Sequence, residues 1–180
     1  RRGIGIDPAD WPLTGRDGTN TRFQPARGLA ARDVPQLALS WSLAIPGGAS
    51  GSPVVSGGRL FVSTGGGEIL ALDAKTGCTL WTFEHGGIVR TLTIGGPAEA
   101  AGEALVLFAD DGGMAFALDA VSGDLRWATR VEEHPLNRAT GAPGVHNGRV
   151  FVTMSSIEDP LTHDPGHACC TSRGSVTALE

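Results

Sequence analysis

The sequence lacks any long apolar run and is poor in basic residues, and each shortage excludes a class of protein. No apolar stretch approaches the roughly 20 residues that a membrane-spanning helix needs, so we expect no membrane span. Lysine and arginine number 14 against 19 acidic residues, and the formal net charge is −5. A nucleic-acid surface needs clustered lysine and arginine to neutralise phosphates, so the composition argues against a nucleic-acid partner.

Long segments with the 3.6-residue periodicity of an amphipathic helix are also missing. Residues 28–37 have room for one helical turn at most. Glycine (27) and proline (11) make up about a fifth of the 180 residues, which is typical of short strands joined by turns. Hydrophobic residues amount to 41%, enough for a packed core. The sequence therefore predicts an all-β fold.

One phrase recurs along the chain. "GGEILALDAKTGCTLW" (66–81) returns as "GGMAFALDAVSGDLRW" (112–127), and its opening returns in "RGSVTALE" (173–180). The three copies are separated by 46 and then 61 residues. Because the chain begins without methionine and stops inside a copy, we expect a piece of a longer protein. The lack of a signal peptide then says nothing about its compartment.

Each copy reads as four strands. "PVVSGGRLFVST" (53–64) and "GVHNGRVFVTM" (144–154) are apolar runs around a tight turn, and Asn-Gly in the second is a strong hairpin signal. A turn at "ALDxxxG" and a tryptophan strand follow. Four strands in about 40 residues are typical of a β-propeller blade. The predicted parts are a closing-blade strand at about 37–45, blade 1 at 52–83, blade 2 at 91–131 and a partial blade 3 at 142–180.

Aromatic and acidic residues recur at fixed places in this repeat. Trp41, Trp81 and Trp127 share one blade position, so we expect them to pack between neighbouring blades. Asp73 and Asp119 share another position, and aspartate there favours a turn. These residues are predicted to build the scaffold.

The third copy departs from the repeat. Pro53 lies 14 residues before Gly67 in the first copy, whereas Pro143 lies 31 residues before Gly174 in the third. The 17 additional residues predict an inserted loop at about 155–172. Repeat proteins carry such insertions on one face, often the binding face.

The insertion contains adjacent cysteines, Cys169 and Cys170. Neighbouring Cα atoms lie about 3.8 Å apart, and ordinary disulfides prefer about 4.4–6.8 Å. A bond between the two would be strained, and strain is usually kept at a functional surface; the alternative is two ordinary thiols. Cys78 has no evident partner and is expected to be free. His163 and His167 have the spacing of zinc ligands, but no second ligand cluster accompanies them.

Several motifs together resemble a known family. They are "DWPLTGRDGTNTRFQPA" (10–26), the "AxDxxxGxxxW" repeats, "TGAPGVHNGRVFVTMSSIED" (140–159) and "CCTSRGSVTAL" (169–179). They are similar to pyrroloquinoline quinone (PQQ)-dependent alcohol dehydrogenases, above all to the polyvinyl-alcohol dehydrogenase branch. The repeat phrase by itself is weakly specific, because cofactor-free propellers such as outer-membrane assembly lipoproteins share it. The loop with paired cysteines and arginine is much more specific.

The resemblance implies an eight-bladed propeller, of which this chain is an N-terminal part of about three blades. It implies PQQ lying flat at the central channel, with calcium bridging a quinone carbonyl and a cofactor carboxylate. On this reading Cys169 and Cys170 form a vicinal disulfide against one face of the quinone. Arg173, three residues further on, would offer a cation to a cofactor carboxylate or a quinone oxygen.

Three more residues are candidate cofactor contacts. Thr140 falls where related enzymes carry a cofactor-contacting glutamate, and it could offer only a hydroxyl. Glu158 lies in the inserted loop, and Arg90 is expected to start an inner strand that faces the channel. The alternatives are a solvated strand-start residue for Arg173, a surface charge for Glu158 and a blade-edge cation for Arg90.

The activity implied by the resemblance is oxidation of an alcohol, with secondary alcohols of a polymer as one substrate class. A hydride would pass to the quinone, and electrons would continue to a cytochrome c or a similar acceptor. The catalytic base and the calcium ligands are expected outside this chain. An oxidised cysteine pair favours a periplasmic or secreted location. The alternative function is a cofactor-free binding scaffold.

Overall fold

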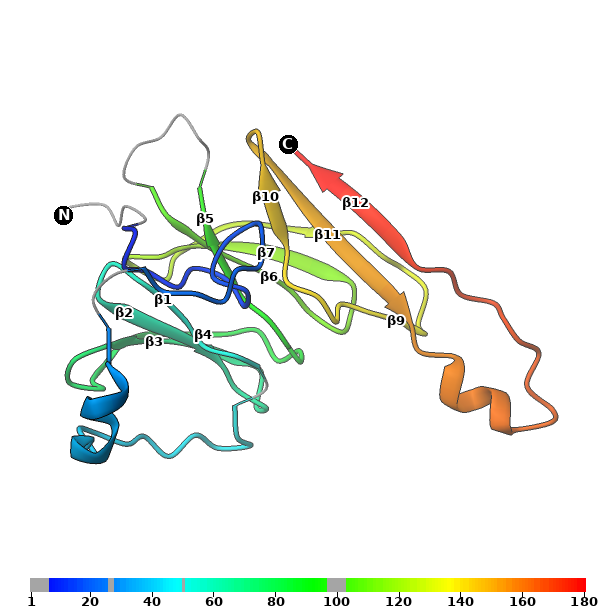
Figure 1. Cartoon of the computed structure of the whole chain (residues 1–180). Helices are drawn as coiled ribbons and strands as arrows, with labels where there is room; N and C mark the ends of the chain where they lie inside the picture. Colours follow the sequence, from blue (N-terminus) through cyan, green and yellow to red (C-terminus); the bar gives the residue numbers. More distant parts are fainter. Residues whose placement is uncertain (1–6, 26–27, 50, 97–102) are drawn as a thin grey trace.

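The computed structural model describes residues 7–25, 28–49, 51–96 and 103–180, and these fold into antiparallel sheets that lie side by side (Figure 1). The first sheet has the order β1 (Val54–Ser56), β2 (Arg59–Ser63), β3 (Glu68–Asp73) and β4 (Thr79–Glu84). The second has the order β5 (Thr93–Gly95), β6 (Leu105–Ala109), β7 (Met114–Asp119) and β8 (Leu125–Arg130). We call these sheets blade 1 and blade 2.

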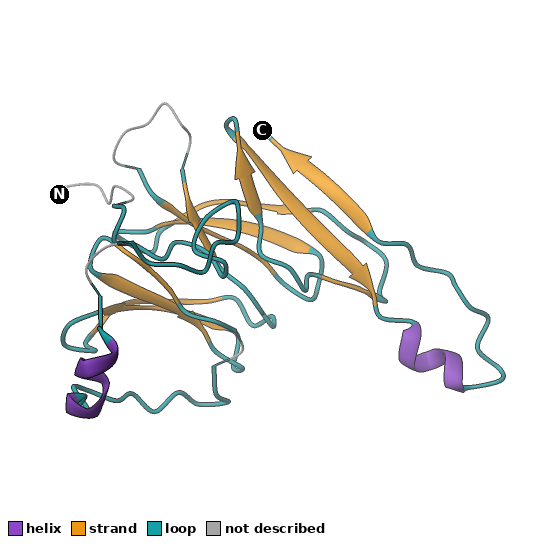
Figure 2. Ribbon diagram, viewed as in Figure 1, coloured by secondary structure: helices purple, strands orange, loops and turns teal. Residues whose placement is uncertain are grey.

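The third sheet, blade 3, places its strands in the same order as the first three strands of the other blades. These strands are β10 (Gly144–His146), β11 (Arg149–Ser156) and β12 (Ser175–Leu179). A short strand, β9 (Asn137–Arg138), pairs with the far end of β11. The described helices are two short 3-10 helices, η1 (Ala31–Gln36) and η2 (Asp159–His163), visible in Figure 2. The all-β prediction is confirmed.

The core lies between the blades. Strands β3 and β7 share one alternating burial pattern because one side of each strand faces the next sheet. Phe61, Val106 and Phe108 have no exposed surface, and they belong to one apolar cluster that joins blades 1 and 2. A second cluster, which includes Val152 and Met154, joins blades 2 and 3. Among the described residues, no helix is long and apolar enough to cross a membrane.

The tryptophans connect successive blades, as their repeat position predicts. The indole nitrogen of Trp81 donates to the carbonyl of Ala120 in blade 2, at 3.3 Å. Trp41 makes the same contact with Ala74 in blade 1, at 3.2 Å. Residues 37–45 nevertheless form no strand, because a strand needs a hydrogen-bonded neighbour and no described segment pairs with them.

Aspartates turn the chain at matching places in blades 1 and 2. Oδ1 of Asp73 accepts from the backbone N–H of Thr76 at 2.7 Å, and Oδ1 of Asp119 accepts from that of Ser122 at 2.8 Å. These hydrogen bonds satisfy backbone donors that the strands leave unpaired, as aspartate does in turns generally.

The inserted loop is positioned slightly later than its predicted bounds of 155–172. Strand β11 has 8 residues, against 5 in β2 and 5 in β6, because its last two residues pair with β9. The connection from β11 to β12 therefore covers 157–174, where blades 1 and 2 have the tight turns 64–67 and 110–113. Figure 1 shows this connection, which we call the cysteine loop, extending well away from the sheets.

Candidate functional site

The candidate residues come from connections at one end of the three sheets. The cysteine loop joins β11 to β12 at the end where β6 turns into β7, since these connections occupy the same place in the repeat. A bridge between Val89 and Asp110 brings the segment before β5 to this end. Thr140, in the segment before β10, reaches the same end of β11. The topology thus gathers segments that are far apart in the sequence.

Cys169 and Cys170 are joined by a disulfide, as predicted, and the peptide bond between them is cis. Both residues are exposed in this chain. Cys78 is free and exposed on a turn of blade 1, as expected. The pair is therefore an accessible and polarizable group in the inserted loop, while Cys78 is remote from it in sequence and unbonded.

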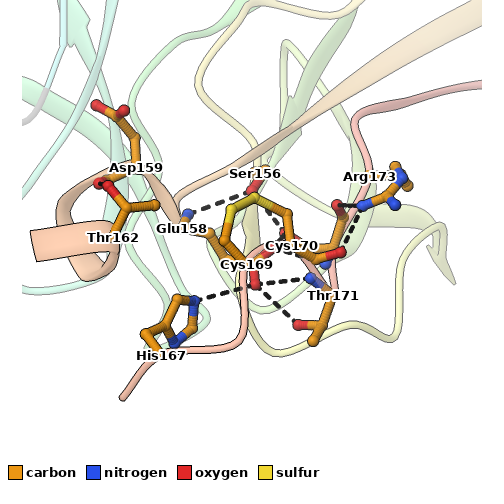
Figure 3. The surroundings of a disulfide bond; sticks show 10 residues. Ser156, Glu158, Asp159, Thr162, His167, Cys169, Cys170, Thr171 and Arg173 are labelled. Carbon is orange, nitrogen blue, oxygen red and sulfur yellow. Dashed lines mark hydrogen bonds and ion pairs between the residues drawn. A yellow bond between two sulfur atoms is a disulfide. The ribbon is translucent and has the colours of Figure 1, made fainter. Parts of the chain in front are cut away.

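Glu158 lies beneath the cysteine pair and is 1% exposed (Figure 3). Its Oε1 accepts from the backbone N–H of Thr171 at 2.8 Å and from the Thr171 hydroxyl at 2.9 Å. Its Oε2 accepts from the Ser172 N–H at 2.6 Å and from the Ser172 hydroxyl. Hydrogen bonds from Ser172 and Thr171 hold the pKa of Glu158 well below its usual range, because they favour the charged form. The carboxylate is thus directed into the loop.

Arg173 turns back toward the cysteine pair. Its Nη1 donates to the carbonyl of Cys170 at 2.7 Å and to that of Ser172 at 2.8 Å (Figure 3). The Asn137 side-chain amide donates to the Arg173 carbonyl at 2.8 Å, which ties this residue to β9. The guanidinium is exposed and keeps further N–H donors for a ligand.

Arg90 belongs to a separate charged cluster. It lies in the connection before β5 rather than at the start of a strand, because β5 begins only at Thr93. Its Nη2 lies 3.0 Å from Oδ2 of Asp111, and Nε of Arg138 lies 4.0 Å from the same oxygen. Two guanidinium groups therefore share one carboxylate near the cysteine loop's end of the sheets.

Thr140 is exposed, and its hydroxyl lies 3.0 Å from the hydroxyl of Ser155 near the end of β11. This hydroxyl pair stands two residues along the strand from Ile157, where the cysteine loop begins. The structure thus places Thr140 beside the base of the loop, with a hydroxyl that can donate or accept.

The candidate residues named from the sequence did not include Asp111. Oδ1 of Asp111 is buried and has no hydrogen-bond partner among the described residues. The signal was in the repeat, since blade 1 carries Gly65 at the matching turn position. Blade 1 forms the same turn with glycine at this position, so the turn itself does not need a charged residue. The aspartate therefore indicates a role other than turn formation.

Metal binding finds no support in the described part of the chain, which contains no group of three or more His, Cys, Asp or Glu side chains placed to hold an ion. His163 ends η2 and is exposed. His167 instead lies with Nε2 at 3.3 Å from Oε1 of Glu158. A cavity of about 900 Å³ lies between the N-terminal segment and strands β5 and β10, and none of the candidate residues lines it.

Comparison with known proteins agrees with this architecture. A family model described as outer membrane protein assembly factor BamB matches residues 21–158, which ends just before η2 and leaves the cysteine pair outside. A polyvinylalcohol dehydrogenase from a Pseudomonas species is 37% identical in an alignment over 179 residues, and the alignment covers 96% of this chain and 27% of that protein. The similarity to the dehydrogenase therefore includes the cysteine loop.

Solved structures match the fold of this chain to different extents. The structure of quinohemoprotein alcohol dehydrogenase ADHIIG from Pseudomonas putida HK5 matches 97% of this chain and 25% of its own, with a TM-score of 0.76 and 24% identity. BamB from Moraxella catarrhalis matches 67% of this chain and 37% of its own, with a TM-score of 0.51 and 23% identity.

The chain spans about a quarter of the length of the dehydrogenases that it matches. The repeated four-stranded sheets, the family model and the similarity along nearly the whole chain agree with one another. The chain therefore belongs to the PQQ-type β-propeller family of the quinoprotein alcohol dehydrogenases.

Proposed function

We propose that the full protein is a PQQ-dependent dehydrogenase of alcohols and that this chain forms one wall of its cofactor site. The observation that carries the proposal is the exposed Cys169–Cys170 disulfide, held in an insertion that interrupts an otherwise regular repeat. A scaffold needs only the repeat. The insertion, the disulfide and the nearby arginine gain a purpose only if something binds at this end of the sheets.

The donor set suits a flat, multiply charged quinone. Cys169 and Cys170 present a polarizable surface without a charge, which can pack against a planar ring. Arg173 and Arg90 are exposed guanidinium groups that can pair with cofactor carboxylates. The Thr140 hydroxyl can donate to a quinone or carboxylate oxygen. PQQ, when bound, supplies a two-electron acceptor for the hydride of the alcohol carbon.

The rest of the proposal concerns parts outside this chain. The catalytic base and the calcium ligands belong to later blades, so this chain binds and orients rather than transfers protons. We propose the secondary hydroxyl groups of a polymer such as polyvinyl alcohol as substrate, because the similarity to a polyvinylalcohol dehydrogenase extends along the chain. Electrons pass to a cytochrome c or a similar acceptor. The disulfide suits a periplasmic or secreted protein, since cytosolic thiols are kept reduced.

The test is a Cys169→Ala, Cys170→Ala double variant of the full-length protein, assayed for turnover of polyvinyl alcohol with PQQ and calcium. We expect turnover to be lost while the melting temperature is unchanged, because two adjacent residues close almost no loop of the unfolded chain. Cys78→Ala is the matched control, because it removes the free, exposed cysteine of blade 1, and it should retain full turnover. Unchanged turnover of an intact double variant contradicts the proposal.

A cofactor-free scaffold is tested by adding PQQ and calcium to the purified full-length protein and recording its absorbance. A bound quinone adds an absorption band that survives removal of free PQQ. Its absence at saturating PQQ favours the scaffold function.

A further inference from the structure

One buried carboxylate joins the two arms of the cysteine loop close to blade 3. The backbone hydrogen bonds within the loop are local: those donated by Leu161, Asp164, His167 and Cys169 reach back only two or three residues. They shape the loop but do not fix it against the sheet. Three contacts tie the ends of the loop to the sheet: the Ile157 N–H donates to the Leu136 carbonyl at 2.8 Å, the Ser156 and Ser172 hydroxyls lie 2.6 Å apart, and the Asn137 amide donates to the Arg173 carbonyl. The hydrogen bonds between the two arms of the loop converge on Glu158, which follows β11 by two residues and is the one charged side chain among the largest fully buried ones described.

Glu158 accepts hydrogen bonds from the two residues directly after the disulfide. All four of its hydrogen-bond donors belong to Thr171 and Ser172, one N–H and one hydroxyl from each. A buried carboxylate is costly without such partners and strongly directional with them, because each oxygen accepts two bonds along fixed lone-pair directions. The two residues that follow Cys170 are therefore held in one position relative to β11.

The same carboxylate is also contacted from the other side of the disulfide. His167, two residues before Cys169, lies with Nε2 at 3.3 Å from Oε1 of Glu158. Figure 3 shows the histidine and Thr171 approaching the carboxylate from opposite sides, with the disulfide between them in the chain. Glu158 therefore lies between the segments that flank the disulfide: it is hydrogen-bonded to Thr171 and Ser172 after the cysteines, and it lies close to His167 before them without a hydrogen bond.

A direct contact between Glu158 and a ligand does not fit this geometry. The side chain is 1% exposed, and both oxygens are occupied by the loop. Cys169, Cys170 and Arg173, in contrast, are exposed.

We propose that Glu158 is the positioning residue of the disulfide: it fixes the Cys169–Cys170 pair against blade 3 and does not itself contact the cofactor. This inference rests on the proposed function in one respect only, namely that the disulfide is positioned in order to contact PQQ. The positioning itself is a property of the chain and can be measured without PQQ.

The experiment uses the full-length protein with Glu158→Gln, and with Asp159→Asn as the matched control. Glutamine keeps the size of the side chain but turns one acceptor oxygen into an NH₂ donor that faces other donors. Asp159 is the neighbouring acidic residue and is exposed; the Thr162 hydroxyl donates to its backbone carbonyl, which Asp159→Asn keeps, and within the described residues its carboxylate accepts no hydrogen bond. The probe is a water-soluble phosphine, which reduces the disulfide; the freed thiols of Cys169 and Cys170 are then alkylated and counted by mass spectrometry.

We expect the disulfide of Glu158→Gln to be reduced at least about tenfold faster than that of the wild type, because hydrogen bonds to charged groups are among the strong ones. Asp159→Asn should react at the wild-type rate. PQQ affinity should fall in Glu158→Gln, with the melting temperature of the blades unchanged. A wild-type reduction rate in Glu158→Gln overturns the inference.

The outcomes separate this inference from the proposed function. Faster reduction with unchanged PQQ affinity supports the positioning role and contradicts the cofactor platform. An unchanged reduction rate contradicts the positioning role, whatever the affinity for PQQ. If Glu158→Gln does not fold, Thr171→Val decides, because it keeps the backbone donor and removes a hydroxyl whose hydrogen bond goes to Glu158. Its disulfide should be reduced a few-fold faster, and a wild-type rate again overturns the inference.

Discussion

Blades 1 and 2 are near copies of each other, whereas blade 3 shares their strands but not their loop. Strands β3 and β7 have the same burial pattern, as do β4 and β8. The pairing of β3 with β4 shifts register between Ala71 and Leu72, and the pairing of β7 with β8 shifts at the matching place, between Ala117 and Leu118. At the matching end of blade 3, the tight turn is replaced by the cysteine loop. Regions that repeat build the scaffold, and the region that breaks the repeat gathers the chemically distinctive groups.

The aligned glycines show how deep the difference goes. Gly67 and Gly113 have φ values of 86° and 81°, which side chains other than glycine rarely adopt. Gly174 aligns with both in sequence, yet its φ lies outside this left-handed region. The four-residue turns of blades 1 and 2 each use a left-handed glycine to reverse the chain, whereas the long connection of blade 3 reverses over many residues. Glycine at this position of the repeat therefore has one physical role in blades 1 and 2 and a different one in blade 3.

The largest expected effect is a loss of stability when the buried core between blades 1 and 2 is disrupted. Phe108→Ala in the full-length protein should destabilise it by about 3–5 kcal/mol, the usual cost of removing a buried aromatic ring. Phe108 has no exposed surface and stacks on Phe116 with ring centroids 4.9 Å apart. Thermal unfolding measures the loss. The Cys169→Ala, Cys170→Ala variant is the comparison and should melt like the wild type; equal losses in the two variants contradict the separation of scaffold and loop.

A second prediction sharpens the glycine comparison. Gly113→Ala should destabilise the protein by more than about 1 kcal/mol, because alanine is strained at positive φ. Its Cβ would also lie 2.3 Å from the carbonyl oxygen of Glu132. Gly174→Ala should cost much less, since its Cβ would lie 3.3 Å from the carbonyl oxygen of Met154. Denaturant unfolding of both variants measures the difference, and a larger cost at Gly174 would refute this account.

A third prediction concerns pH and blade 3. The pKa of Glu132 is lowered to about 2, first by a backbone hydrogen bond from His134 and then by Asn137. A lowered pKa in the folded protein gives stability that is present above the ordinary value of 4.5 and is lost as the pH falls toward about 2. The melting-temperature gap between wild type and Glu132→Gln should therefore be constant near neutral pH and should shrink below about pH 4.5.

The control for this pH series is Glu133→Gln, which changes the exposed neighbouring carboxylate. Its melting temperature should follow the wild type at every pH. A gap for Glu132→Gln that widens on acidification has the wrong sign and refutes the assignment.

The smallest expected effect tests a difference between blades 1 and 2 themselves. Arg126 pairs with Asp119 at 2.6 Å in blade 2, whereas blade 1 carries Leu80 at the matching position. Arg126→Leu should change the stability by no more than about 1 kcal/mol, because exposed ion pairs contribute little. Leu80→Arg, beside Asp73, is the reciprocal change. A loss of several kcal/mol in Arg126→Leu would show that the pair is structurally important.

Much of the fold could be predicted because the same pattern of strands and turns occurs in more than one copy of the repeat. The spacing of Trp81 and Trp127, the turn aspartates and the hairpins recur, and each recurrence supports the same four-stranded unit. The disulfide followed from the resemblance. The predicted strand at 37–45 did not form, since strand pairing depends on a neighbour that the sequence pattern of the segment cannot supply. Trp41 nevertheless keeps the indole contact with blade 1 that the repeat requires.

The role of Glu158 could not be predicted in the same way. Its neighbours Thr171 and Ser172 are 13 and 14 residues away along a loop with no repeat to align them. Arg90 was expected in a strand facing a channel, and it instead pairs with Asp111, whose turn resembles an ordinary scaffold turn. Such contacts depend on how loops from different blades meet.

The sequence by itself determined the strands of the repeat, their order within a blade and the place where the repeat is interrupted. Alternating apolar residues and recurring turn residues act over a few positions, so strands and turns can be recognised from a short stretch of sequence. The tertiary structure decided which polar groups of the insertion turn inward and which remain exposed. Burying the Glu158 carboxylate requires four donors at once, and only the closed loop brings them together.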